Sequence, residues 1–346
     1  DFVRTKMYIT GGAGARHEGE AFGLSYELPN ETAYAETCAA IASFMWNWRM
    51  LQVTGEARFA DEMERALYNN ILSGVSLDGK EYFYVNPLQN RGDHRRTTKH
   101  FDGCACCPPN VARTFAALPG YIYSVGKNDE IVVHHFVQSN AEIQTRHGTV
   151  RLHQETNYPW SGDVKITLSL EKPERFAINI RFPSWAQKVF TKINGKRVRA
   201  ESSPGTYICL QRMWKNNDTI ELTFPMPVEK IAADPRVKDN VGRVTIRRGP
   251  VVYCVEEIDQ KGVALHTVQL SKKTVFEERY EPDVLGGVVI LEFDAQVKQD
   301  NAPLYQPLGR KSKNTVKSVR LKAIPYYSWA NREPCPMLVW LPQSLE

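Results

Sequence analysis

The stretch Cys104-Ala-Cys106-Cys107-Pro108-Pro109-Asn110 places three thiols directly before a predicted helix. The two prolines suit a first helical turn, and apolar residues at spacings of three and four extend the helix to Pro119-Gly120. The dipole and the free amide groups at a helix N-terminus stabilise a thiolate. The stretch therefore predicts a helix that begins beside a cluster of chemically competent thiols.

A second stretch, Glu36-Thr37-Cys38, adds a carboxylate and a further thiol. Zinc prefers tetrahedral sets of sulfur, nitrogen and carboxylate oxygen, and it deprotonates a bound thiol. The two stretches together predict a zinc site. Buried cysteines without chemistry are the simpler alternative, but packing alone explains poorly why three cysteines fall within four positions before two prolines.

The cysteine count favours reduced thiols over a disulfide framework. Seven cysteines in 346 residues are sparse and odd in number, whereas disulfide scaffolds are short secreted chains. The sequence leaves open a vicinal disulfide between Cys106 and Cys107.

Apolar periodicity divides the chain near residue 124. Residues 1–123 are predicted to be helical, because apolar side chains recur every three or four positions from Tyr34 to Val53 and from Arg58 to Leu72. Glu36 and Cys38 fall near the start of the first of these helices.

Beyond residue 124 the apolar period is two, as in Val164-Lys-Ile-Thr-Leu-Ser-Leu170, which indicates strands. Asn194-Gly195 favours a hairpin turn. Many short strands with Gly, Pro and Asn between them predict two antiparallel β-sandwich domains. We place one at 124–234, completed by about 333–346, and the other at 235–332.

Charge says little about partners. There are 44 basic and 39 acidic residues, for a formal charge of +5, and the basic residues are scattered. The densest basic stretch, Arg91 to Arg96, is better explained as a solvated loop than as an anion site. Apolar runs are far shorter than the roughly twenty residues of a membrane helix, and the first residues lack the pattern of a signal peptide. We expect a soluble protein without nucleic-acid or membrane partners, from the bacterial cytoplasm or periplasm.

The N-terminal loops offer carboxylates. Thr10-Gly-Gly-Ala-Gly14 lacks the Gly-Lys-Ser/Thr ending of a phosphate loop, whereas His17-Glu18-Gly19-Glu20 puts two carboxylates near a third, Glu36. A carboxylic acid and a strong nucleophile suffice for glycoside cleavage, because one protonates the leaving oxygen while the other attacks the anomeric carbon. Taken alone, Glu18 and Glu20 are explained more simply as surface charges.

The order of the motifs resembles glycoside hydrolase family 127, the β-L-arabinofuranosidase family, and its close relative family 146. The matching motifs are Gly11-Gly-Ala-Gly14, Gly19-Glu-Ala-Phe22, Glu36-Thr-Cys-Ala39, Tyr84-Val-Asn-Pro-Leu88 and Cys104 to Asn110. The segments Ala323 to Asn331 and Val339 to Pro342 extend the resemblance over nearly the whole chain.

The resemblance implies a retaining exo-glycosidase that releases terminal β-L-arabinofuranose from plant-derived glycans or glycopeptides. It implies that Cys106 is the nucleophile and Glu20 the general acid and base. Zinc would be held by Glu36, Cys38, Cys106 and Cys107. Tyr84 and Glu36 would contact the sugar, and Cys104 would line the site.

The family's catalytic domain is an (α/α)6 toroid of about twelve helices, and residues 1–123 have room for four or five. The resemblance thus implies the C-terminal part of a toroid followed by two β-sandwiches. A longer parent protein, a partner chain that supplies the other half, or an inactive remnant would each account for this, and a homodimer is a further option. None of the eight histidines matches the histidines of the family's pocket; His17, His94 and His100 are nearest to the motifs.

Three alternatives stay open at this point. The protein is a related glycosidase of another furanose, or a non-catalytic, zinc-stabilised carbohydrate-binding module in which Trp160, Trp185 and Trp214 stack on sugars, although core packing explains such aromatics more often. A cysteine peptidase or acyltransferase is the third alternative. It requires a Cys–His pair that no local motif provides.

Overall fold

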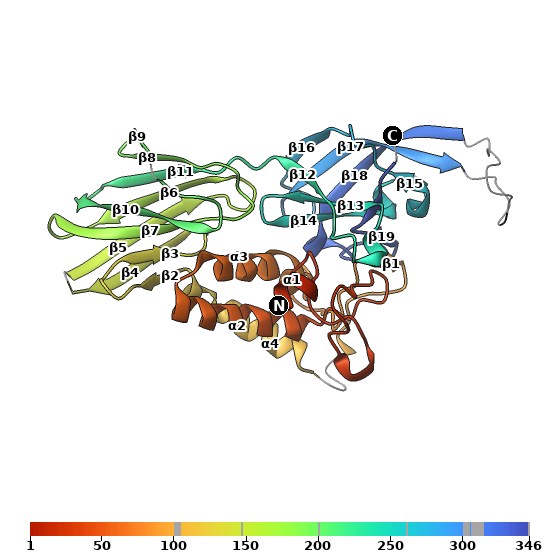
Figure 1. Cartoon of the computed structure of the whole chain (residues 1–346), viewed down its shortest axis with the longest axis horizontal. Helices are drawn as coiled ribbons and strands as arrows, with labels where there is room; N and C mark the ends of the chain where they lie inside the picture. The colour runs from red at the N-terminus through yellow and green to blue at the C-terminus, as the bar shows by residue number, and fades with distance from the viewer. Residues whose placement is uncertain are drawn as a thin grey trace. The chain divides into compact units, whose positions relative to one another are not determined.

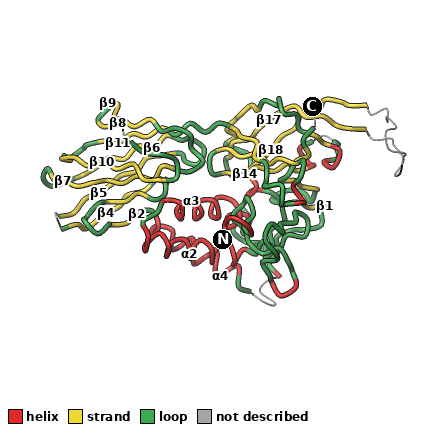
Figure 2. The backbone as a smooth tube through the Cα atoms, in the orientation of Figure 1, coloured by secondary structure: helices red, strands yellow, loops and turns green. Residues whose placement is uncertain are grey.

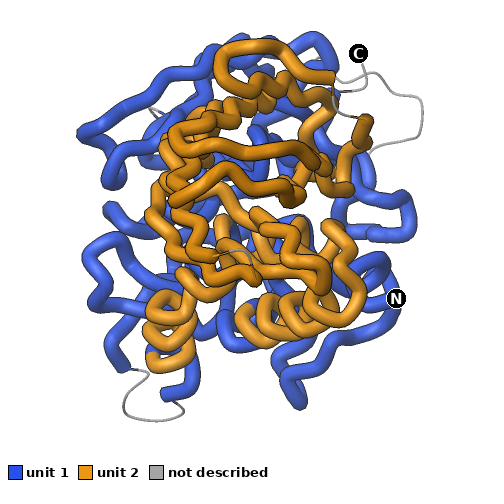
Figure 3. The backbone as a smooth tube through the Cα atoms, turned by 90° about the vertical axis from the view of Figure 1, so that its left-hand side faces the viewer, with its two compact units in different colours: residues 1–40, 69–108, 228–346 blue, residues 41–68, 109–227 orange. Residues whose placement is uncertain are grey.

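The computed structural model describes residues 1–99, 105–146, 148–199, 201–260, 262–299, 305 and 315–344 (Figure 1). It is a mixed structure with few helices and β-rich regions (Figure 2). The chain divides into two compact units (Figure 3). Unit 1 comprises residues 1–40, 69–108 and 228–346, and unit 2 comprises residues 41–68 and 109–227. None of the helices in the described ranges is long and apolar enough to span a membrane.

The three main helices confirm the predicted periodicity. They are α2 (Thr37–Thr54), α3 (Ala57–Arg65), which continues as the π-helix η2 (Ala66–Ile71), and α4 (Cys107–Ala117), followed by the 3-10 helix η4 (Leu118–Tyr121). Gly55 ends α2 with a φ of 69°, and its amide donates to the Leu51 carbonyl, which caps the helix. Pro108 lies in the first turn of α4, where a missing amide hydrogen costs nothing.

Unit 2 contains two sheets that share one core. The first has the order β10-β7-β3-β2 and the second the order β4-β5-β6-β11-β8-β9. The strands of the first sheet are β2 (Tyr123–Val125), β3 (Ile131–Val133), β7 (Glu174–Phe182) and β10 (Thr206–Trp214). Those of the second are β4 (Ser139–Thr145), β5 (Gly148–Thr156), β6 (Asp163–Ser169), β8 (Phe190–Ile193), β9 (Lys196–Val198) and β11 (Thr219–Thr223).

Alternating burial explains the unit 2 core. Val164, Ile166 and Leu168 of β6 point inward between polar neighbours, as a half-buried strand requires. Residues 194 and 195, the predicted hairpin turn, connect β8 to β9 with φ angles of 51° and 73°. Trp185 and Trp214 are buried in this core, which disfavours the role of sugar platforms that one alternative required of them.

A buried charge cluster joins α3 to β7 within unit 2. The guanidinium of Arg181 donates to Asp61 Oδ1 at 2.6 Å and to Glu64. Glu64 also accepts from the Tyr158 hydroxyl at 2.6 Å and from the Trp185 indole at 3.0 Å. Two carboxylates thus surround one guanidinium, and the cluster supplies its own counter-ions.

Unit 1 is built on a ten-stranded sheet whose main path is β1-β19-β14-β18-β17-β15, with β12, β13, β16 and β20 off this path. Its strands are β1 (Gln89–Arg91), β12 (Val228–Ile231), β13 (Arg243–Arg248), β14 (Val251–Glu256), β15 (Val268–Gln269), β16 (Phe276–Glu281), β17 (Val288–Gln299), β18 (Thr315–Pro325), β19 (Pro336–Leu338) and β20 (Leu341–Pro342). Short helices connect them: η5 (Lys238–Asn240), η6 (Glu257–Asp259), η7 (Leu265–Thr267) and η8 (Tyr326–Ser328).

One predicted strand assignment is wrong. Residues 333–346 were predicted to complete the first β-rich domain, but β19 pairs with β1 and β14, and β20 pairs with β13, all in the unit 1 sheet. The reason is physical: a period of two specifies that a segment is a strand and which face is buried, but it does not select the neighbouring strand.

Long loops of unit 1 carry the predicted motifs. Apart from isolated β-bridges, the segment before α2 contains the short helices α1 (Phe2–Thr5) and η1 (Glu18–Glu20), and the segment from residue 74 to residue 98 contains the short strand β1. These loops, together with the first turns of α2 and α4, position the site.

Candidate metal centre and active site

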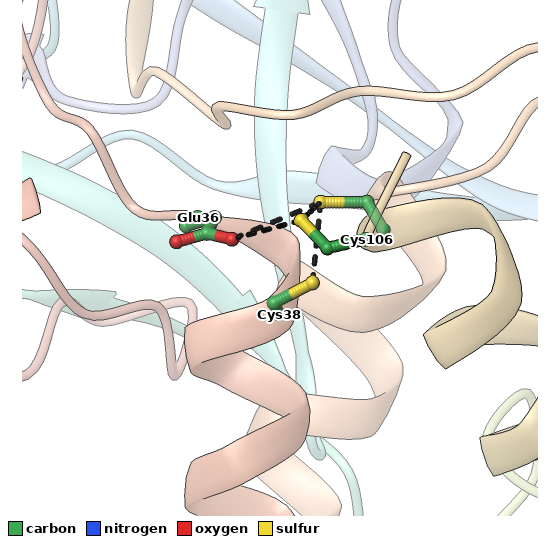
Figure 4. Close-up of side chains that lie close together, drawn as sticks. Glu36, Cys38 and Cys106 are labelled. Atoms are coloured by element: carbon green, nitrogen blue, oxygen red, sulfur yellow. Dashed lines mark hydrogen bonds between the residues drawn. The ribbon is translucent and has the colours of Figure 1, made fainter. Parts of the chain in front are cut away.

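Two helix starts bring the predicted ligands together (Figure 4). Cys38 lies in the first turn of α2 and Glu36 immediately precedes that helix. Cys107 is the first residue of α4, and Cys106 comes just before it. All four residues belong to unit 1. The amide groups at both helix starts favour negative charge on these side chains.

The four side chains converge on one point. Their ligand atoms all lie within 4.8 Å of one another. The Sγ atoms of Cys38 and Cys107 are 3.4 Å apart, and those of Cys106 and Cys107 are 3.7 Å apart. Glu36 Oε1 lies 3.5 Å from Cys106 Sγ and 4.0 Å from Cys107 Sγ.

These separations fit a tetrahedral zinc ion. With Zn–S bonds of about 2.3 Å and Zn–O bonds of about 2.1 Å, tetrahedral geometry separates two sulfurs by about 3.8 Å and a sulfur from an oxygen by about 3.6 Å. A disulfide requires a sulfur separation of about 2.05 Å. Cys106 and Cys107 are free cysteines, so the vicinal disulfide that the sequence left open is absent from this structure.

Without a cation, the cluster opposes ionisation of its own groups. Burial raises the pKa of the Cys106 thiol to about 12, and Cys38 adds to this effect. Hydrogen bonding with the Cys38 sulfur, followed by burial, raises the pKa of Cys107. Burial also raises the pKa of Glu36, with a further contribution from Glu20. Several acidic groups crowded into a buried site therefore require positive charge to ionise together.

The backbone that presents Glu36 is held in an uncommon conformation. Ala35 has a φ of 38°, in the left-handed region that non-glycine residues rarely occupy. The Asn86 amide donates to the Ala35 carbonyl at 2.9 Å and to Thr37 Oγ1 at 3.0 Å. Thr37 Oγ1 in turn donates to the Phe83 carbonyl at 2.8 Å. The sequence analysis did not identify Asn86, although it lies inside the Tyr84–Leu88 motif.

The glycine-rich stretch serves the same backbone. A Cβ atom on Gly12 would collide with the side-chain amide of Asn70 and would crowd the Ala35 Cβ at 3.1 Å. Asn70 itself donates to the Ala35 carbonyl at 3.3 Å. These contacts explain why a side chain is excluded at position 12 and account for the motif without a phosphate ligand.

Glu20 lies at a second group of side chains beside the cluster. Tyr34 donates to Glu20 Oε1 at 2.6 Å, and Tyr84 donates to the same oxygen at 3.1 Å. The Tyr84 hydroxyl is also within hydrogen-bonding reach of Cys106 and Glu36, and donation of its single proton to either of them lowers the pKa of that group. Tyr84 therefore links Glu20 to the thiol cluster. The sequence analysis missed Tyr34, whose only signal was its position two residues before Glu36.

Two of the histidines nearest to the motifs, His17 and His94, pack against aromatic rings. The ring of His17 packs edge-on against Tyr34 with centroids 5.1 Å apart. The ring of His94 stacks on Phe83 at 4.7 Å, and its Nε2 lies 3.0 Å from the Val85 carbonyl. In contrast, Cys106 Sγ contacts Glu36 and Cys107, which is not the Cys–His pair of a cysteine peptidase. Cys104 and His100 lie outside the described residues.

Comparison with known family models accounts for almost the whole chain. Three models of β-L-arabinofuranosidase family GH127 match: the catalytic domain over residues 1–120, the middle domain over residues 130–226, and the C-terminal domain over residues 228–342.

Individual relatives indicate the same family as the family models. A non-reducing end β-L-arabinofuranosidase of Bifidobacterium longum subsp. longum is 35% identical over 98% of this chain and 54% of its own length. A GH127 β-L-arabinofuranosidase from Geobacillus stearothermophilus T6 superposes with a TM-score of 0.92 at 40% identity, covering 99% of this chain and 55% of that chain. Another GH127 β-arabinofuranosidase has a TM-score of 0.91 at 38% identity, with coverages of 99% and 55%. The chain spans about half the length of these relatives, and it belongs to glycoside hydrolase family 127.

Proposed function

We propose that the protein is a retaining exo-glycosidase that releases terminal β-L-arabinofuranose, with Cys106 as nucleophile and Glu20 as general acid and base. The observation that carries this proposal is the convergence of Glu36 and three cysteines within 4.8 Å, with Tyr84 linking them to Glu20. Plant-derived glycans or glycopeptides are the expected substrates. We propose further that residues 1–123 form part of an (α/α)6 toroid and that the β-rich parts are sandwiches.

Glu36, Cys38, Cys106 and Cys107 would hold zinc, since their donor types and separations suit it. When bound, zinc supplies the positive charge that lets these thiols ionise at neutral pH. Burial and neighbouring thiols raise the pKa values of Cys106 and Cys107, and these values must fall before Cys106 can react as a thiolate.

Burial distinguishes Cys106 from Cys107, whereas Cys38 is partly exposed like Cys106. Cys107 is fully buried, whereas Cys106 is partly exposed and hydrogen-bonds with Tyr84 on the side of Glu20. A nucleophile must reach the anomeric carbon, so Cys106, which shares Tyr84 with Glu20, is a better candidate than the buried Cys107.

The reaction then has two steps. The Cys106 sulfur forms a bond to the anomeric carbon as the glycosidic C–O bond breaks, and Glu20 gives its proton to the departing oxygen. Glu20 next removes a proton from water, the water oxygen attacks the anomeric carbon, and the Cys106 sulfur leaves as thiolate. Two displacements at one carbon retain its configuration. Glu36 and Tyr84 would contact the sugar hydroxyls.

The first experiment combines metal content with hydrolysis of an aryl β-L-arabinofuranoside. We expect about one zinc per chain and chelator-sensitive release of the aryl group. Cys106→Ser should lower turnover by at least about 10⁴-fold with the fold intact, because a neutral hydroxyl is a poor nucleophile. Cys209→Ser, at an exposed thiol, is the matched control.

Each other outcome has a definite meaning. Substantial turnover by Cys106→Ser would exclude the cysteine mechanism. Zinc without turnover on this sugar, but with release from an aryl glycoside of another furanose, would assign the alternative specificity. Absence of bound metal would overturn the zinc proposal.

Glu20→Gln tests the acid role. We expect it to slow substrates with poor leaving groups by about 10²- to 10⁴-fold, and activated aryl glycosides much less, because only the former need full protonation. Glu18→Gln, at an exposed carboxylate in the same short helix, should act like the wild type. Equal losses on both substrate types would argue against an acid role for Glu20.

A further inference from the structure

Two tyrosine hydroxyls converge on one oxygen of Glu20. Tyr34 and Tyr84 donate to Oε1 at 2.6 Å and 3.1 Å, and in the described part of the chain the hydrogen bonds of the Glu20 side chain all end on this atom. A carboxylate oxygen has two lone pairs, so Oε1 is saturated as an acceptor while both hydroxyls donate to it. A proton carried by Glu20 therefore belongs on Oε2.

Tyr34 is built to hold this position. Its side chain is buried, with 6% exposure of the residue, and its ring packs edge-on against His17 at 5.1 Å and Tyr84 at 6.0 Å. Its carbonyl accepts a hydrogen bond from the backbone N–H of Asn86 at 3.2 Å. A Cβ on Gly14 would approach the Tyr34 ring to 3.2 Å, so the loop is close-packed against it. The hydroxyl is thus presented from a fixed ring.

The local backbone, in contrast, does not fix the side chain of Glu20, so another residue must orient it. Glu20 is exposed, it ends the three-residue helix η1, and its φ is 51°, next to Gly19 at 66°. A long carboxylate side chain on such a turn has several accessible rotamers. The short hydrogen bond from a buried tyrosine selects one of them, which is the kind of preorganisation that proton transfer requires.

We propose that Tyr34 is a positioning residue for Glu20, and that it fixes Oε2 as the oxygen that carries and transfers the catalytic proton. This inference rests on the proposed acid and base role of Glu20. Tyr84 alone does not provide the same function, because Cys106 and Glu36 compete with Glu20 for its single hydroxyl proton. In the first step the proton leaves Oε2 for the glycosidic oxygen, and in the second step Oε2 receives the proton of water.

Tyr34→Phe tests the proposal, because it removes the hydroxyl and keeps the ring. On an alkyl β-L-arabinofuranoside, kcat should fall by about 10- to 100-fold with little change in KM. On an activated aryl glycoside the loss should be much smaller. Bound metal should be unchanged. Tyr82→Phe is the matched control: it removes a hydroxyl that donates to the Gly79 carbonyl at 3.2 Å, away from Glu20, and should change none of these values.

Two further measurements separate positioning from structure. In the Glu20→Gln background, Tyr34→Phe should cause no additional loss, because a residue that acts through Glu20 has nothing left to position. Infrared spectroscopy on protein labelled with ¹³C-glutamate, with Glu20→Gln as the reference for assignment, should show that Tyr34→Phe shifts the Glu20 carboxylate bands. That readout does not depend on turnover.

The outcomes distinguish this inference from the proposed function. An unchanged infrared band and unchanged kcat on the alkyl glycoside would overturn the role of Tyr34. Uniform losses on all substrates with loss of metal would also overturn it, since they indicate a structural role. If the wild type hydrolyses no arabinofuranoside, the proposed function fails, whereas the infrared shift still decides whether Tyr34 orients Glu20.

Discussion

Two clusters of acidic groups in the described part of the chain differ in what neutralises them. In unit 2, Asp61 and Glu64 surround the fully buried guanidinium of Arg181. In unit 1, Glu36 and three cysteines surround a point, and the neighbours with the largest effects on their pKa values are thiols, a carboxyl group and a phenol. The first cluster contains its own cation, and the second offers four ligand atoms to one.

This difference teaches how to separate a structural charge cluster from a functional one. A buried charge is tolerated when it is paired and hydrogen-bonded, and the Arg181 cluster satisfies this with donors from Tyr158 and Trp185 as well. In the second cluster burial raises the pKa values of Glu36, Cys106 and Cys107, so burial alone does not stabilise their ionised forms. Such an arrangement makes physical sense as a site that binds positive charge.

The largest expected effect follows from breaking the Arg181 cluster. Arg181→Met should lower the free energy of unfolding by about 3–5 kcal/mol, because two carboxylates lose their buried counter-ion. Denaturant unfolding, followed by Trp fluorescence, measures this change. Arg151→Met is the control, since Arg151 pairs with Glu142 on the surface at 3.0 Å and should cost less than about 1 kcal/mol. A similarly small loss for Arg181→Met would contradict the comparison.

In the cluster of Glu36 and three cysteines, a substitution should lower metal affinity. Cys38→Ser should weaken zinc binding at least about 100-fold, or about 2.7 kcal/mol, because a thiolate ligand is replaced by a neutral hydroxyl. Competition with a chelator of known affinity measures the change. Cys335→Ser removes a thiol of unit 1 outside the cluster and should leave the affinity unchanged. Unaltered zinc binding by Cys38→Ser would remove Cys38 from the ligand set.

The pH dependence of stability offers a further test of the buried charge in unit 2. Burial, with a contribution from Arg181, lowers the pKa of His134 to about 3 and lowers that of His135. Below pH 6.5 the unfolded state binds more protons than the folded state at these groups, so stability should fall as the pH falls. The slope approaches about 1.4 kcal/mol per pH unit for each histidine.

His135→Phe isolates this effect, because neither ring nitrogen of His135 has a hydrogen-bond partner among the described residues. The variant should lose less stability on acidification than the wild type in denaturant titrations at several pH values. Asp61 has a raised pKa and opposes the trend, but it is present in both proteins and cancels in the difference. Parallel stability curves for the two proteins would show that His135 does not contribute.

The smallest effect concerns the support of Glu36. Asn86→Ala should weaken zinc binding about tenfold, or about 1.4 kcal/mol, because the Ala35 carbonyl and Thr37 lose the donor that holds the ligand-bearing backbone. The chelator competition measures this change as well. Asn240→Ala removes another buried amide of unit 1, one that accepts from Asn30 at 2.8 Å, and should leave zinc binding unchanged. If both variants bind zinc equally, Asn86 has no role in presenting Glu36.

Local patterns predicted the elements better than their partners. The helices α2, α3 and α4 and the turn at Asn194-Gly195 follow from spacing and turn chemistry, which act over a few residues. The pairing of β19 with β14 does not, because strand partners are chosen by packing between segments far apart in sequence.

The site shows the same limit. The types of ligand were evident from Cys106-Cys107 and Glu36-Thr37-Cys38, and the structure brings these residues together. The residues that orient them were not evident. Tyr34 and Asn86 are ordinary polar residues until the loops fold, and only then does a hydroxyl lie 2.6 Å from Glu20 and an amide 2.9 Å from the Ala35 carbonyl.

The sequence by itself therefore determined the chemistry that is available: thiols and carboxylates at two helix starts, a helical region followed by strands, and motifs that mark the family. Only the tertiary structure decided which groups meet. It set the four ligand atoms within 4.8 Å of one another, placed both tyrosine hydroxyls on one oxygen of Glu20, and enclosed Arg181 between two carboxylates. The physical reason is that donor type is a property of a residue, whereas charge compensation and hydrogen-bond geometry are properties of distances between residues remote in the chain.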